Sequence, residues 1–103
     1  MAKLITVYWR DIPSQVIAKR GRDTAKVPLT QRFQTAIDRA AMRAGKGSSD
    51  LYIDEWRREA RACGNNLEAE ARAEAEKLET AFSDVLLDRM AKAGGVKVEG
   101  AGG

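Results

Sequence analysis

The first hydrophobic positions of the chain alternate in a way that is typical of a strand. Residues 4–10 place Ile5, Val7 and Trp9 on one side and apolar or weakly polar residues on the other. β-Branched and aromatic residues at this density favour a strand, and apolar positions on both sides indicate that both of its faces are largely buried. We therefore expect an inner strand here.

A polar corner follows this strand and leads into a second apolar run. Pro13 lacks an N–H and restricts Ile12, so strand pairing should break over residues 11–14. Residues 15–20 then predict a second strand, antiparallel to the first. Residues 25–29 form a possible further extended piece, which a proline at position 28 would confine to an edge.

The clearest helix starts after Thr30, a residue type that caps helix N-termini well. Phe33, Ile37 and Ala40 then recur at helical spacing, and Gly45 is a typical stop.

Residues 51–58 allow two interpretations. Tyr52, Asp54 and Trp56 alternate with Leu51, Ile53 and Glu55, which permits a strand. Ser49 as a cap would instead start a short helix. The aromatic density favours the strand. In that case the Trp56–Arg57 step can lie beside the Trp9–Arg10 step.

The last element is a long helix over residues 67–93, with Asn66 as its cap and Ser83 as a second cap that would split it. Residues 94–103 are Gly-rich and predict a flexible tail. The fold expected for residues 1–93 is a single α+β domain. Its small antiparallel sheet, an N-terminal hairpin plus a third strand, is covered on one face by two or three helices.

Charge is distributed unevenly along the chain, although its net value is only +3. Residues 1–48 hold ten Lys/Arg against three acids, and residues 49–103 hold eight against twelve. The two halves can attract each other in the fold, or the basic half can meet an acidic partner. A basic cluster around one predicted turn makes a nucleic-acid-binding module the alternative function, and its members are Lys19, Arg20, Arg22 and Lys26. A solvated charged turn is the simpler interpretation.

Residues suited to reaction chemistry are scarce. The chain has no histidine and a single cysteine, Cys63, which excludes a disulfide within the chain and the usual zinc patterns. No glycine-rich phosphate motif follows a strand. We therefore expect no catalytic residue, metal or cofactor, and a protein that is not an enzyme. The first apolar run is too short for a signal peptide and no stretch is long enough to span a membrane, so we expect a cytoplasmic protein.

The best candidates for binding are the two Trp–Arg steps, because Trp and Arg are the types most enriched at binding hot spots. Two interpretations stay open: a surface for a partner, or core tryptophans with an internal Arg10–Asp11 salt bridge. The candidate partner-binding residues are Trp9, Arg10, Asp11, Trp56, Arg57 and Arg58.

Several of these stretches resemble the small "virulence factor" domain family of alphaproteobacteria. The likeness covers roughly residues 3–93, and its most specific part is the Trp-Arg-Asp-Ile-Pro run. The matching stretches are Leu4 to Val16, Arg32-Phe33, Ala36 to Gly45, Tyr52, Glu55 to Arg58, and Cys63-Gly64 before the Ala/Glu helix.

The resemblance implies a setting but no reaction, because stand-alone members of the family accompany folate- and cobalamin-dependent methyl-transfer proteins. It carries over no catalytic residue. The function expected from the sequence is a non-catalytic accessory protein whose partner is another protein, such as a methyltransferase component of methionine synthesis.

Overall fold

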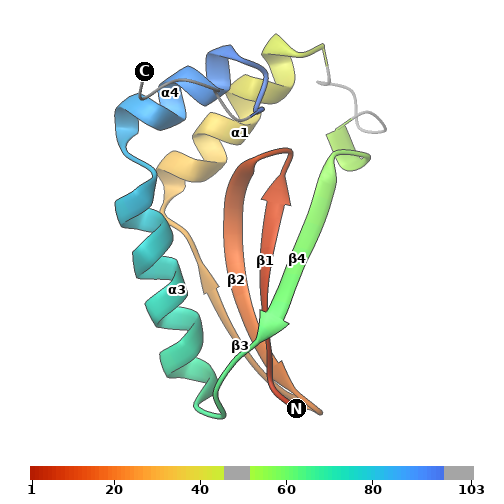
Figure 1. Cartoon of the computed structure of the whole chain (residues 1–103). Coiled ribbons are helices and arrows are strands. Elements are labelled where there is room, and N and C mark those ends of the chain that lie inside the picture. Colours follow the sequence, from red (N-terminus) through yellow and green to blue (C-terminus); the bar gives the residue numbers. More distant parts are fainter. Residues whose placement is uncertain (46–51, 97–103) are drawn as a thin grey trace.

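The structure, a computed structural model, describes residues 1–45 and 52–96. It confirms an α+β fold with an antiparallel sheet of order β3-β2-β1-β4. The strands are β1 (Lys3–Trp9), β2 (Ile12–Arg20), β3 (Asp23–Pro28) and β4 (Trp56–Ala62), and the helices are α1 (Gln31–Arg43), α3 (Leu67–Ala81) and α4 (Asp84–Lys92). In Figure 1, α3 runs along one side of the sheet, α1 and α4 lie at its end, and β4 is the strand farthest from α3.

The β1–β2 turn is tighter than the sequence indicates. Only Arg10 and Asp11 lie between the strands, and Ile12 and Pro13 are paired with β1, so the prediction that pairing breaks over residues 11–14 is wrong for these two residues. It holds for Asp11, in the turn, and for Ser14, which has no partner in the β1–β2 register. A register shift between Val7 and Tyr8 accompanies the proline. Such irregularities are where a sheet tolerates a residue that lacks an N–H.

The segment with two interpretations contains a strand, but that strand starts later than expected. Tyr52 lies in a short helical stretch, and β4 begins only at Trp56. The Tyr52 carbonyl accepts hydrogen bonds from the Trp9 indole and from the Glu55 N–H, so it takes no part in strand pairing. Residue 51, the proposed Ser49 cap and the loop at 46–50 lie outside the described residues.

The caps at the later helices behave as the sequence predicts, whereas the first does not. The Asn66 side chain accepts from the Ala69 N–H at 3.2 Å, and Ser83 splits the long helix by accepting from Leu86 at 3.1 Å. Thr30 holds the N-cap position of α1 but its side chain makes no capping bond. Its hydroxyl is 2.9 Å from the Glu79 carboxylate of α3, so it joins two helices instead.

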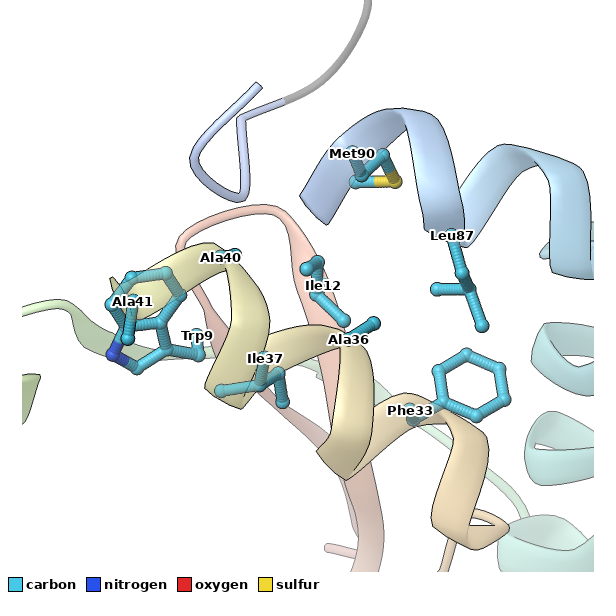
Figure 2. Close-up of a cluster of buried hydrophobic side chains, with 9 residues drawn as sticks. All are labelled: Trp9, Ile12, Phe33, Ala36, Ile37, Ala40, Ala41, Leu87 and Met90. Atoms are coloured by element: carbon cyan, nitrogen blue, oxygen red, sulfur yellow. The ribbon is translucent and has the colours of Figure 1, made fainter. Parts of the chain in front are cut away.

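Two hydrophobic clusters hold the helices on the sheet. The first lies under α3, where Leu4, Val16 and Ala18 pack against Ala71 and Leu78. The second lies at the end of the sheet, where α1 and α4 meet the β1–β2 hairpin (Figure 2). Its buried members are Trp9, Ile12, Phe33, Ala36, Ile37, Ala40, Ala41, Leu87 and Met90.

The start of the expected flexible tail belongs to this second cluster. Gly95 bonds through its N–H to Met90 and through its carbonyl to the Asp11 N–H. Both it and Gly94 have positive φ, at 93° and 78°, which glycine adopts without a steric penalty. The chain therefore turns back over Trp9 after α4. Residues 97–103, the rest of the predicted tail, are outside the described residues.

Candidate interaction surface

Trp9 is a core residue. Its side chain is fully buried, its indole N–H donates to the Tyr52 carbonyl at 2.8 Å, and its ring stacks on Tyr52 with centroids 5.8 Å apart. Figure 2 shows it close to Ala41 and Ile37 of α1. Because no part of Trp9 reaches the surface, this residue cannot itself contact a partner.

Trp56 lies directly opposite Trp9 in the β1–β4 register, so the two Trp–Arg steps are adjacent as predicted. Its ring is only half-buried and meets Tyr52 edge-on, with centroids 5.7 Å apart. The three rings form one aromatic cluster, which is closed at Trp9 and reaches solvent at Trp56.

Arg10 holds the sheet to the end of α4. It adopts a positive φ of 53° in the turn, and its guanidinium lies 5.4 Å from the centroid of the Trp9 ring. It donates to the Gly94 carbonyl at 3.0 Å and to the Glu55 carboxylate at 3.2 Å. These contacts tie together three distant segments, so Arg10 stabilises the fold.

Arg57 makes a different set of contacts, on the outside of the molecule. Its guanidinium lies 4.5 Å from the centroid of the Tyr8 ring, and its Nε donates to the Arg10 carbonyl at 2.8 Å. It also pairs with Asp11 at 3.2 Å and with Glu59. The structure thus brings two candidate residues, Asp11 and Arg57, into one charged group, in which Arg57 remains 40% exposed.

This charged group forms one side of a groove between β4 and α4, which we call the β4–α4 groove. It has a volume of about 330 Å³. Its apolar part comes from the helical side and its charges come mainly from the strand side. The lining residues are Tyr8, Asp11, Arg57, Glu59, Phe82, Leu86 and Met90.

The electrostatics of the groove are dominated by the Arg57 ion pairs. Burial raises the pKa of the Tyr8 hydroxyl, and the nearby Glu59 carboxylate adds to this, so Tyr8 is a neutral hydrogen-bonding group at ordinary pH. Partial burial acts to lower the pKa of Arg57, but its bonds to Glu59 and Asp11 outweigh that effect and raise it. Arg57 is therefore a fixed positive charge held between two carboxylates.

Arg58 points away from this groove. Strand alternation sends it to the opposite face of the sheet, where it lines a second hollow of about 490 Å³ with Val7, Gln15 and Trp56. The six candidate partner-binding residues therefore do not form one patch. Trp9 is in the core and Arg10 connects three segments. Strand alternation directs Arg57 and Arg58 to opposite faces, although Arg57 also borders the second hollow.

The four candidate nucleic-acid residues are also divided. Lys19 and Lys26 are exposed on the same face as Arg58, because Lys26 is the register partner of Ile17, two residues before Lys19. Arg20 belongs to the helix-covered face, and Arg22 lies in the turn between β2 and β3. Only Lys19 and Lys26, two of the four candidate nucleic-acid residues, therefore share a face of the sheet.

Several groove residues escape the sequence analysis. Tyr8 appears there only as part of the strand pattern, and Glu59 falls beyond the end expected for that strand. Phe82 and Leu86 stand at the α3–α4 break, and no local pattern indicates that they face Arg57. Strand alternation is the one signal that the sequence offers here. It places the Tyr8 side chain on the side of β1 opposite Trp9, and therefore away from the core cluster.

Among the residues that the structure describes, no group of three or more His, Cys, Asp or Glu side chains is placed to hold a metal ion. No helix in this part of the chain has the length and hydropathy needed to cross a membrane. Cys63 is partly buried after the end of β4.

Comparison with known proteins gives one finding. A family model described as "Virulence factor" matches residues 7–91, which include both Trp–Arg steps and all of the β4–α4 groove. No curated protein and no solved structure matches the sequence. Since the family model spans most of the chain, the protein belongs to the virulence factor family.

Proposed function

We propose that this protein is a non-catalytic accessory protein that binds another protein through the β4–α4 groove. The observation that supports this best is the composition of the groove. Apolar side chains from the helices lie next to the charged group of Asp11, Arg57 and Glu59. An apolar centre with a polar rim is the usual anatomy of a protein interface.

Arg57 is well prepared for recognition. Its guanidinium is held against the Tyr8 ring and by three hydrogen-bonding groups, so little side-chain freedom remains to be lost when a partner binds. Arginine on an aromatic ring is also typical of the residues that dominate binding energies. Because Arg57 binds both carboxylates of the groove, this arrangement favours recognition over acid–base chemistry.

The strand beside the groove is accessible as well. β4 is an edge strand of the sheet, and all of its residues after Trp56 are exposed. A partner seated in the groove can therefore extend over β4 without displacing a helix. For the setting of this binding we propose the one that the family resemblance implies, a protein component of folate- or cobalamin-dependent methyl transfer.

Capture of partners from the native host by tagged protein tests the proposal, with two neighbouring positions of α4 as a matched pair. Leu86→Asp places a charge in the groove, whereas Val85→Asp places the same charge at a side chain that is 64% exposed and outside it. We expect the wild type and the Val85 variant to retain the same partner and the Leu86 variant to lose it.

Quantitative mass spectrometry of the captured proteins gives the readout, and circular dichroism checks that both variants are folded. Equal capture by a folded Leu86 variant would rule out the groove as the binding site. A captured set without any methyl-transfer protein would refute the proposed setting but not the groove.

A further inference from the structure

The sheet has a second face, opposite the one that α3 covers. By strand alternation Trp9 lies at one end of this face, where it packs against α1, and the helices of the two clusters leave the rest of the face uncovered. Strand alternation and register assign Ile5, Val7 and Ile17 to this face. Val7 and Ile17 are buried, yet they belong to neither cluster that holds the helices. We call this surface the open sheet face.

Every strand contributes one basic residue to the open sheet face: Lys3, Lys19, Lys26 and Arg58. All four are exposed. Within the strands that the structure describes, alternation places no Asp or Glu on this face. The acidic residues of the strands, Asp23 and Glu59, belong to the helix-covered face. The charge of the open sheet face therefore has a single sign.

The arrangement of these charges is unfavourable for the isolated protein. Lys3 and Lys19 are direct partners across the β1–β2 pair, and Lys26 is diagonal to Lys19 on the next strand. Like charges directly opposite each other in a sheet destabilise it. An anionic partner would remove this repulsion, because it would supply the negative charges that the face lacks.

We propose that the open sheet face binds nucleic acid through the phosphate backbone. A surface with charges of one sign suits a partner whose charges are uniformly of the other sign, whereas the β4–α4 groove, with both signs, suits a protein. Lysine ammonium groups recognise phosphate as point charges, without fixed geometry. The aromatic ring that approaches this face is Trp56, at one end, so the binding is independent of sequence and depends on salt.

The hairpin formed by β2 and β3 provides a matched pair of variants. Lys19→Glu with Lys26→Glu reverses two charges on the open sheet face. Arg20→Glu with Arg22→Glu makes the same change in net charge, but at the covered face and in the turn. Any effect of overall charge is the same for both double variants. A difference in their affinity for nucleic acid therefore shows that binding depends on the open sheet face.

The test is fluorescence anisotropy with short labelled single-stranded DNA and RNA of mixed sequence. The wild type should bind both, and four neutralised phosphates imply an affinity loss of roughly 50-fold between about 50 and 200 mM salt. We expect the Lys19/Lys26 variant to lose roughly ten-fold or more in affinity and the Arg20/Arg22 variant to lose much less. A milder Lys19→Gln/Lys26→Gln variant should fall between the wild type and the double glutamate variant.

Three results would overturn the proposal. One is no binding at low salt, and another is an equal loss in the two double variants when circular dichroism shows both folded. The third is displacement of the oligonucleotide by polyglutamate at a lower charge concentration than by unlabelled DNA, which would assign the face to an acidic protein.

Discussion

The two Trp–Arg steps have the same sequence, and their tryptophans are paired across β1 and β4, yet their surroundings are opposite. Trp9 is fully buried and Arg10 is bonded to the backbone of Gly94 and to Glu55. Trp56 is half-buried, and Arg57 lies at the surface over Tyr8. The difference comes from position in the sheet, because β1 is an inner strand that meets α1 and β4 is an edge strand. An identical dipeptide is thus a core anchor in one place and part of an exposed surface in the other.

The largest expected effect is the difference in stability between the two tryptophan-to-alanine variants. Trp9→Ala should lower the free energy of unfolding by about 3–5 kcal/mol, because it empties a packed core site and removes a hydrogen bond. Trp56→Ala should lower it by about 1–2 kcal/mol, because part of that ring stays in water. Urea denaturation followed by far-UV circular dichroism measures both. Equal losses would show that the two steps are energetically equivalent.

The contact between Gly95 and Trp9 is tested by Gly95→Ala. An added Cβ would lie 2.7 Å from a Trp9 ring carbon, at a φ of +93°, so we expect a loss of about 3 kcal/mol in unfolding free energy. Gly21→Ala is the control, since its φ is also positive, at +59°, but its Cβ meets open space. A loss of about 1 kcal/mol is expected there. A Gly95 loss no larger than that of Gly21 would mean that backbone strain alone is responsible.

The two arginines should also differ in stability. Arg10→Ala removes charged hydrogen bonds to a carbonyl and a carboxylate in a half-buried site, so a loss of about 2 kcal/mol is expected. Arg57→Ala should cost less than about 1 kcal/mol, because its ion pairs are largely solvated. Thermal melts of both, with the exposed Arg72→Ala as reference, give the comparison. A larger loss for Arg57 would make it a structural residue and weaken the case for the groove.

The smallest expected effect concerns Tyr8, whose pKa is raised in the folded protein. The unfolded chain ionises this residue near pH 10, while the folded chain still holds the proton. The resulting stability is fully present below that pH and is lost as pH rises through the folded pKa. Tyr8→Phe should therefore lose less stability than the wild type under alkaline conditions, with little change at neutral pH.

Absorbance titration of tyrosinate checks the same point directly. Glu59→Gln should lower the pKa of Tyr8, because the Glu59 charge is one of the causes of its rise. An unchanged titration in this variant would show that the Glu59 charge does not contribute to the raised pKa of Tyr8.

The fold follows from the sequence to a large extent, because its signals are local. Alternation identifies β1, and the caps at Asn66 and Ser83 identify the start of α3 and of α4. The errors arise where a residue bonds to a partner far away in the sequence instead of making the local hydrogen bond that its position predicts. Thr30 bonds to Glu79 instead of capping its own helix. The Tyr52 carbonyl accepts a hydrogen bond from the Trp9 indole instead of taking part in strand pairing.

The candidate surfaces follow from the sequence much less well. Residue type draws attention to Arg57 and to Lys19 with Lys26, which lie on the two candidate surfaces. It also groups them with Trp9 and Arg20, which face elsewhere. Faces depend on register, and the register shift near Pro13 cannot be read from composition or spacing. Leu86 and Phe82 reach the groove only because α3 and α4 fold back over the sheet.

The sequence by itself determined most of the elements and where two helices are capped. It gave the meeting of the two Trp–Arg steps as the consequence of one of two interpretations. These properties arise from periodicity, caps and turn residues that act over a few positions. Only the tertiary structure decided that Trp9 is buried and Arg57 exposed, that Gly95 closes over Trp9, and that basic residues from all four strands share one face. Burial and facing depend on contacts between residues far apart in the chain. Local sequence indicates the inner position of β1 and, through Pro28, the edge position of β3, but it does not show that β4 is the other edge.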